Sequence, residues 1–242
     1  MLSIIIPTLN EEKYLPVLLE SVFKNSLDDF EIIIADNNSE DRTKEIAKIY
    51  GCKIVQGGLP AKGRNQGTLA ARGDLLLFLD ADIILANGFF EKSLKEFKER
   101  SLCVASYCLI PNTKNIALRR GFNVFYNWPI MASEKTLAYG AMAIMVKKEV
   151  FEKAGGFNEK INLAEDHHFV RQARKFGKFG IIRSTHIIMT MRRFERDGYL
   201  NTFLKYFFCN LQMIFRMRAT SGVFKYKFGH YSSPIRSKQK EV

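Results

Sequence analysis

Apolar runs and helical periodicity alternate through the first third of the chain. The runs, rich in isoleucine, valine and leucine, occupy residues 3–6, 31–35, 53–56 and 75–79. Such continuous runs are typical of parallel strands that are buried on both faces. Between them, helical spacing or helix-boundary residues predict helices over 14–23, from Ser39 to Gly51 and over 62–72. We therefore predict an α/β fold with a mostly parallel, Rossmann-like sheet flanked by helices.

The pattern is less regular after Leu85. We expect a helix over 89–100, a strand over 102–109, a strand over 138–147, a short helix that ends at Gly155 and Gly156, and a helix over 164–176. The aromatic stretch 119–129, RRGFNVFYNWP, matches no regular element.

Residues 199–217 form an amphipathic segment whose polar positions fall within about 60° of one another on a helical projection. A basic and aromatic tail follows up to Tyr231 and beyond. One interpretation is a helix and tail that lie in a lipid interface. The other is a helix packed on the core, and the pattern fits both.

The charge is distributed unevenly along the chain. The 242 residues are 47% hydrophobic and 26% charged, which excludes disorder for most of the chain. Residues 1–168 carry 21 basic and 22 acidic side chains, whereas residues 169–242 carry 16 basic side chains against Glu195, Asp197 and Glu241. The basic part would attract nucleic acid, anionic lipid or diphosphates.

Targeting signals are not evident. No apolar run approaches the roughly 20 residues of a membrane-spanning helix, and the start, MLSIIIPTLNEE, has no basic leader. The four cysteines have neither zinc-site spacing nor the density of a disulfide scaffold. We expect a cytoplasmic protein, either free or peripheral on the cytoplasmic face of the membrane.

Four segments follow the predicted strands, at residues 7–11, 36–39, 57–64 and 80–82. In open α/β sheets ligands bind beyond the carboxyl ends of the strands, so these segments should form one cleft. Asp80 and Asp82 are two residues apart and project to the same side of extended chain. Their oxygens suit Mg²⁺ or Mn²⁺, although a simple strand-to-loop cap would also explain this pair.

Basic side chains should converge on the same cleft if it binds a diphosphate. Lys62 and Arg64 lie near a predicted helix start, where backbone N–H groups also favour anions. Arg192 and Arg193 could approach from the second half, and arginine suits bidentate phosphate contacts. Each of the four could equally be a solvated surface charge.

The chain resembles the family 2 glycosyltransferases of the GT-A fold. The resemblance covers about residues 1–196 and rests on five motifs in the family's order: SIIIPTLNEE, IIIADNNSEDRT, KGRNQGTLAARGDLLLFLDADI, YGAMAIMVKKEVFEKAGGFNE and AEDHHF. It implies that residues 1–110 are a nucleotide-sugar-binding half and residues 111–198 an acceptor-binding half of one domain. Residues 199–242 would be an amphipathic, basic C-terminal segment.

The resemblance also implies roles for single residues. Pro7, Thr8 and Glu11 would line the nucleotide pocket, and Asp36 would contact the base. Arg64 and Asp80 would hold the donor, and Arg192 or Arg193 would clamp its diphosphate. Lys62 is expected on the donor side only from its position near the predicted helix start. Asp82 would bind the metal beside Asp80, and His186 would complete its ligands, although a lone histidine is more often a packed residue.

Asp166, in the Glu165–Asp166 pair, would be the general base that takes the proton of the acceptor hydroxyl. From the residues alone, both acids could simply stabilise the first turn of a helix. Three departures from the family pattern matter. The acidic motif after the second strand is Asp36-Asn37-Asn38-Ser39. The Gln-x-x-Arg-Trp motif of processive synthases is absent, and so are their membrane spans.

We therefore expect an inverting, metal-dependent enzyme that moves one sugar from GDP-mannose or a UDP-hexose to an acceptor hydroxyl or phosphate. The expected acceptor is a saccharide or is lipid-linked, and no nucleic-acid partner is expected. The alternative is a basic membrane- or nucleic-acid-binding protein without catalysis. Dinucleotide-dependent dehydrogenases and P-loop hydrolases are disfavoured because their glycine motifs do not occur. The sugar, the base, the acceptor and the oligomeric state stay open.

Overall fold

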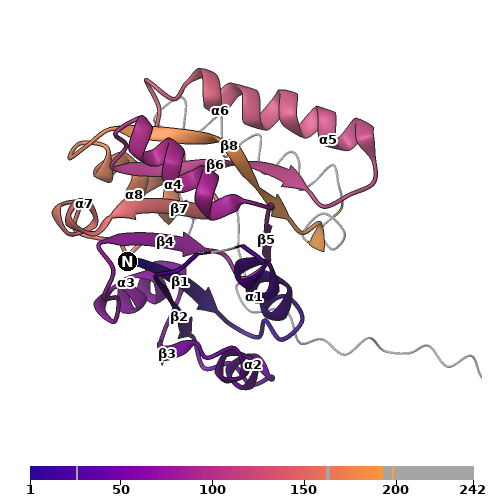
Figure 1. Ribbon diagram of the computed structural model, residues 1–242, viewed down its shortest axis with the longest axis vertical. Helices are drawn as coiled ribbons and strands as arrows, with labels where there is room; N and C mark the ends of the chain where they lie inside the picture. The colour runs from indigo at the N-terminus through magenta and orange to yellow at the C-terminus, as the bar shows by residue number, and fades with distance from the viewer. Residues whose placement is uncertain (26, 162–163, 193–197, 199–242) are drawn as a thin grey trace, which may run out of the picture.

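The computed structural model describes residues 1–25, 27–161, 164–192 and 198. Within these residues one eight-stranded sheet has the order β3-β2-β1-β4-β7-β6-β8-β5 and carries helices on both faces (Figure 1). The first elements are β1 (Leu2–Thr8), α1 (Leu15–Phe23), β2 (Phe30–Asp36), α2 (Thr43–Ile49), β3 (Lys53–Gln56), α3 (Pro60–Leu69), β4 (Leu75–Leu79) and β5 (Ile83–Leu85). The others are α4 (Phe89–Glu99), β6 (Val104–Pro111), α5 (Ile116–Phe122), the π-helical turn η1 (Asn123–Asn127), α6 (Trp128–Ala132), β7 (Ala143–Lys147), α7 (Lys148–Lys153), α8 (Glu165–Ala173) and β8 (Phe179–Met189).

Strand direction brings the ends of several strands to one edge of the sheet. β1 pairs in parallel with β2 and with β4, and β2 pairs in parallel with β3. β7 is antiparallel to both β4 and β6, so β6 runs in the same direction as β4. β8 is parallel to β6, while β5 is antiparallel to β8. The carboxyl ends of β1, β2, β4, β6 and β8 therefore share one edge, which we call the carboxyl edge.

The apolar runs build a core on both faces because successive strand residues point in opposite directions. Ile4 and Ile6 of β1 contribute to a cluster that also contains the buried faces of α1 and α4. Ile5 points the other way, into a second cluster with α3, α7 and α8. The continuous apolar runs are therefore explained by helices on both sides, and the predicted α/β sheet is confirmed as a mixed one.

The second half holds the differences from the sequence-based expectations. The stretch 119–129 is helical: it runs from α5 through η1 into α6, and the π-turn breaks the 3.6-residue periodicity that would have revealed it. The strand expected over 138–147 is shorter, because only Ala143–Lys147 forms β7. Gly140, in the part that is not strand, instead packs against the backbone of Asp166.

The amphipathic helix and basic tail expected from residue 199 onward lie outside the described residues. Within the described part of the chain, no helix combines the length and the apolar character needed to cross a bilayer. The division at residue 110 stays a prediction, since one sheet includes strands from both sides of it.

Two glycines allow α3 to lie directly on β1. A Cβ at Gly67 would stand 2.4 Å from Cγ2 of Ile5, and one at Gly63 would stand 3.0 Å from Cβ of Pro7. This close approach carries Arg64, between the two glycines, to the carboxyl edge.

We expect Gly67→Ala to destabilise the fold by about 1–3 kcal/mol, because the added methyl overpacks the contact with Ile5. Gly121→Ala is the matched control, since it is also helical and its Cβ would meet nothing within 4 Å. The control should be neutral or up to about 1 kcal/mol more stable. Urea unfolding measures both, and equal midpoints would show that α3 does not depend on this close approach.

Candidate active site at the carboxyl edge

Asp36 fastens the ends of β1 and β2 together. Its carboxylate, which is only 3% exposed, accepts bonds from the Thr8 hydroxyl at 2.9 Å and from the Ser39 hydroxyl at 2.6 Å. The Ser39 N–H also donates to it, at 2.9 Å. Asn38 adopts a φ of 58°, a left-handed conformation that asparagine tolerates. Thr8 and Asp36 thus lie in hydrogen-bond contact, while the nucleotide pocket and the base contact of Asp36 stay predictions.

Glu11 and Asp82 share one arginine from the far end of the described chain. Arg192 places Nη1 2.9 Å and Nη2 3.2 Å from the two carboxylate oxygens of Glu11. Its Nη2 also lies 3.0 Å from Oδ2 of Asp82. The guanidinium stacks over the ring of Tyr14 at 4.6 Å from the centroid. All three charged side chains are buried or nearly so, which strengthens their mutual attraction.

Burial raises the pKa of Glu11 to about 7. The hydrogen bond and charge of Arg192 oppose this rise, while the nearby charges of Asp82 and Asp80 add to it. Glu11, Asp80 and Asp82 therefore form an acidic group, and the positive charge of Arg192 only partly neutralises it.

A second arginine ties α3 to β4 and α8. Arg64 Nη2 lies 2.8 Å from Oδ1 of Asp80, and Nη1 lies 2.8 Å from Oε1 of Glu165. The guanidinium also sits 5.1 Å from the ring centroid of Phe157. Burial works against the charge, but Asp80, Glu165 and Asp166 outweigh it and raise the pKa of Arg64. Arg64 therefore stays a cation in the protein interior.

Asp166 begins α8 next to Glu165, in the acidic first turn of that helix. Its Oδ1 accepts a hydrogen bond from the N–H of His167 at 2.7 Å. The Gly140 N–H donates to Nδ1 of His167 at 3.0 Å, which ties this turn to the loop before β7. The charge of Asp166 acts on Arg64, which is paired with Asp80, so Asp166 lies close to the same charged group.

The other predicted residues have different outcomes. Pro7 lies in β1 against α3, as the contact with Gly63 shows, and Lys62 is exposed in the first turn of α3. Arg193 lies outside the described residues. His186 is not brought to the aspartates: it lines a separate pocket with Ser21 and Lys92.

The register of β8 explains the position of His186. The Thr190 N–H bonds to the carbonyl of Asp82 at 3.3 Å, and His186 lies four residues earlier. At about 3.3 Å per residue, this places His186 roughly 13 Å away along the strand. Burial, with the charges of Arg119 and Lys92, lowers its pKa. His186 is therefore too far from Asp82 to bind the same metal ion, and only Asp80 and Asp82 remain of the expected metal ligands.

Asp80 and Asp82 still fit a hard divalent cation. In the described residues no group of three or more acidic, histidine or cysteine side chains is arranged to hold a metal. Mg²⁺, however, is often held by one or two carboxylates together with substrate phosphates and water. The charges of both aspartates also raise the pKa of Glu11, so this edge would be stabilised by a cation.

Two members of the site escape sequence reasoning. Glu165 is the second partner of Arg64, and Tyr14 is the platform under Arg192. Tyr14 contributes to the helical pattern as an ordinary apolar residue, and Glu165 stands out only as a neighbour of Asp166. In both cases the partner is distant in sequence, so no local signal could have identified the contact.

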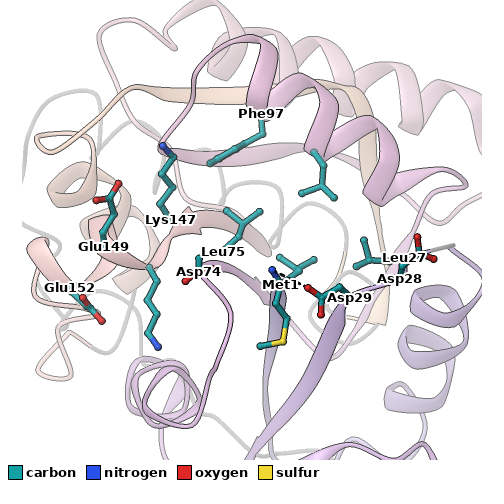
Figure 2. Close-up of a pocket in the computed structure, with 13 residues that line it drawn as sticks. Met1, Leu27, Asp28, Asp29, Asp74, Leu75, Phe97, Lys147, Glu149 and Glu152 are labelled. Atoms are coloured by element: carbon teal, nitrogen blue, oxygen red, sulfur yellow. Dashed lines mark ion pairs between the residues drawn. The ribbon is translucent and has the colours of Figure 1, made fainter.

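A separate groove lies at the opposite edge, at the amino ends of β1 and β4 (Figure 2). Its lining combines apolar side chains such as Leu75 and Phe97 with Asp29, Lys147 and Glu149. Because this groove lies at the amino ends of the strands, and Asp80 and Asp82 lie at the carboxyl edge, it is not part of the carboxyl-edge site.

The fold agrees with the comparisons to known proteins. The sequence profile of Glycosyl transferase family 2 matches residues 3–175. The chain belongs to this family.

An uncharacterized glycosyltransferase of Haemophilus influenzae is 31% identical over 185 residues, which cover 70% of this chain and 60% of that protein. The chondroitin synthase of Pasteurella multocida is 30% identical over 74% of this chain but only 19% of its own length. The chain thus spans little more than half, or less, of these relatives.

Solved structures share the fold. Staphylococcus aureus TarS 1–349 in complex with UDP-GlcNAc superposes with a TM-score of 0.63 and 23% identity, covering 78% of this chain and 58% of that one. The mannosyltransferase PcManGT of Pyrobaculum calidifontis, in complex with GDP-Man and Mn²⁺, gives a TM-score of 0.61 and 20% identity over 75% of this chain and 54% of that one. The GT-A type fold is therefore confirmed.

The raised pKa of Glu11 predicts a pH dependence of stability. A carboxyl group with a pKa of about 7 in the folded chain and 4.5 when unfolded favours folding most below pH 4.5, and this contribution is lost as the pH rises through 7. Relative to Glu11→Gln, the wild type should therefore lose up to about 3 kcal/mol between pH 4.5 and 8.

Urea titrations at several pH values measure this difference. Glu40→Gln is the control, because Glu40 is exposed and should follow the wild type throughout. A Glu11→Gln profile parallel to that of the wild type would contradict the raised pKa.

Proposed function

We propose that this chain transfers a single sugar from a nucleoside-diphosphate sugar to an acceptor hydroxyl or phosphate, with inversion at the anomeric carbon. The observation that carries the proposal is the pairing of two buried arginines, Arg64 and Arg192, with the carboxylates of Asp80 and Asp82 at the carboxyl edge. This edge is where open α/β sheets bind ligands. Family membership gives the arrangement its chemical interpretation.

The nucleotide-sugar donor would bind at the carboxyl ends of β1, β2 and β4. Thr8 and Asp36 would border the nucleoside, and Arg64 with Asp80 would hold the sugar diphosphate. The TarS and PcManGT structures are complexes with UDP-GlcNAc and with GDP-Man, and we propose a UDP-hexose or GDP-mannose as the donor here.

Arg192 would exchange partners when the donor binds. In the structure its guanidinium lies between Glu11 and Asp82. A diphosphate is a stronger partner for a guanidinium fork than a carboxylate of raised pKa, since phosphate accepts bidentate bonds and brings more charge. When Arg192 leaves Asp82, the Asp82 carboxylate would become free to bind a divalent cation. Lys62 and Arg193 would be further contacts to the phosphates.

Asp80 and Asp82 would hold Mn²⁺ or Mg²⁺, which supplies Lewis-acid neutralisation of the departing diphosphate. Arg64, fixed by Glu165 and Phe157, orients Asp80 for this task. Rigid support of this kind matters because small displacements of charged groups reduce their effect on a transition state.

Asp166 would act as the general base. Its carboxylate takes the acceptor proton while the acceptor oxygen attacks the anomeric carbon. The bond from that carbon to the diphosphate breaks, and its electron pair leaves with the phosphate oxygen. A single displacement of this kind inverts the anomeric centre, and it needs the base on the face opposite the leaving group.

The acceptor and the location complete the proposal. We propose a lipid-linked or saccharide acceptor and a peripheral position on the cytoplasmic face of the membrane. The basic residues 199–242 support this position, since they would attract anionic lipid. The absence of the Gln-x-x-Arg-Trp motif supports one sugar per encounter rather than processive synthesis.

Nucleotide binding tests the donor site. UDP or GDP should raise the melting temperature, since a ligand at about 100 times its Kd stabilises the native state by about 2.7 kcal/mol. Mn²⁺ should enlarge the shift, and Asp82→Asn should remove the Mn²⁺-dependent part. Asp28→Asn is the control, because Asp28 is exposed at the opposite edge. No shift with either nucleotide would overturn the donor site and favour the non-catalytic alternative.

Asp166→Asn tests the base. We expect kcat to fall by about 10²–10⁴-fold, which is the usual contribution of general base catalysis, while UDP or GDP affinity stays within about twofold of the wild type. Radiolabelled sugar transfer measures kcat, and the melting-temperature shift measures nucleotide affinity. Unchanged turnover would reject Asp166 as the base.

A further inference from the structure

The helical rod formed by α5, η1 and α6, residues 116–132, exposes a row of large apolar side chains. We call it the α5–α6 ridge. Ile116, Val124, Phe125 and Trp128 are each between 56% and 66% exposed. Ile116, Val124 and Trp128 share a spacing of four residues, together with Arg120, so they form one stripe along the rod. Figure 1 shows the rod running along one side of the molecule, far from α2 and β3.

The opposite side of the ridge is fastened to the sheet, which fixes the exposed stripe outward. Asn127 is 2% exposed and donates to the carbonyl of Leu109 in β6 at 2.8 Å. The Leu109 N–H donates back to Oδ1 of Asn127 at 3.0 Å. Phe122 and Ile130 are buried on the same side. The anchored side of the rod therefore holds the apolar stripe facing away from the sheet.

Charge distinguishes this stripe from an ordinary exposed apolar patch. Residues 112–133 contain no aspartate or glutamate, and their charged side chains are Lys114, Arg119 and Arg120. None of these three takes part in an ion pair among the described residues. A helix with Trp, Phe and aliphatic residues beside unpaired basic ones matches the chemistry of a bilayer interface.

We propose that the α5–α6 ridge docks on an anionic lipid bilayer. Ile116, Val124 and Trp128 enter the interface, and the basic side chains of α5 meet the phosphates of the headgroups. Aromatic rings, tryptophan above all, favour this depth of the bilayer because one part of the ring system is apolar and one is polar.

The position of the ridge relative to the site supports this occupant. The Asn112 N–H bonds to the carbonyl of Met189 at 2.9 Å, so the chain that leads into α5 lies beside the end of β8. The ridge therefore begins at the carboxyl edge, and docking brings the site close to lipid headgroups. The lipid contact stands on the ridge alone, and its use for a lipid-linked acceptor rests on the proposed function.

Charge argues against the C-terminal segment as the occupant. That segment, residues 199–242, is as basic as the ridge: its charged residues are Lys205, Arg216, Arg218, Lys225, Lys227, Arg236, Lys238 and Lys240 against Glu241. Two surfaces of the same sign repel each other and share an attraction to anionic lipid. A basic segment plus inserted apolar side chains also provides the two signals that stable peripheral binding requires.

Trp128 reports its own environment, because it is the only tryptophan in the chain. The full chain is mixed with vesicles of phosphatidylcholine and phosphatidylglycerol, with or without brominated acyl chains. We expect the emission to shift to shorter wavelength and the bromine to quench it. Vesicle binding without shift or quenching would overturn the ridge contact and leave the basic segment of the proposed function as the anchor.

Variants separate the apolar and the electrostatic parts. The double variant Ile116→Ser, Val124→Ser should lower vesicle partitioning by about tenfold or more, and Arg120→Gln should lower it by about fivefold on anionic vesicles. The matched control is Ile49→Ser, Leu69→Ser, whose side chains are 71% and 80% exposed on other helices. Equal loss in the control, or no loss in the ridge variants, would overturn the proposal.

Measurements without lipid test the other occupants. Exposed Trp128 should be fully accessible to acrylamide at every protein concentration. Protection that does not change with concentration would assign the stripe to the C-terminal segment, and protection that increases with concentration would assign it to a second copy. Donor hydrolysis should be unchanged in all ridge variants, so a chain that docks but does not hydrolyse donor would contradict the proposed function alone.

Discussion

The burial of two guanidinium groups among carboxylates at the carboxyl edge is the constraint on which the site depends. Parallel strands end here in Asp36 and, one residue beyond β4, in Asp80, so the fold itself concentrates negative charge. Unpaired buried carboxylates would be costly, since desolvation disfavours their charged form. Arg64 and Arg192 stabilise this arrangement, and removing one partner of such a buried pair commonly costs about 3–5 kcal/mol.

The two arginines differ in how the chain supplies them. Arg64 comes from a helix that two glycines press onto β1, and it is fixed by Asp80, Glu165 and the ring of Phe157. Its position is therefore set by the core. Arg192 comes from the chain just beyond β8 and contacts Glu11, which follows β1, and Asp82, which follows β4. Arg192 is therefore held by side-chain contacts beyond the last strand and not by the packing of a helix on the sheet.

Local chemistry could be predicted from the sequence where it depends on neighbours in the chain. Continuous apolar runs identify the first strands, and the spacing of Asp80 and Asp82 places both at one strand end. Pairings across the chain could not be predicted: Glu11 and Arg192 are 181 residues apart, and Arg64 and Glu165 are 101 apart. Such contacts follow from strand order and register, which no local pattern specifies.

His186 and the α5–α6 ridge are two further features that the sequence did not predict correctly, for different reasons. His186 has the right residue type but the wrong register, because the residue that bonds to Asp82 is Thr190, four residues later and just beyond the end of β8. The ridge has an uninformative sequence pattern because the π-turn at Asn123–Asn127 breaks the helical period. Its buried Asn127 nevertheless fixes the orientation of the whole rod through β6. The register of β8 thus determines that Thr190, not His186, meets Asp82. The hydrogen bonds of Asn127 to β6 determine which apolar side chains of the rod stay exposed.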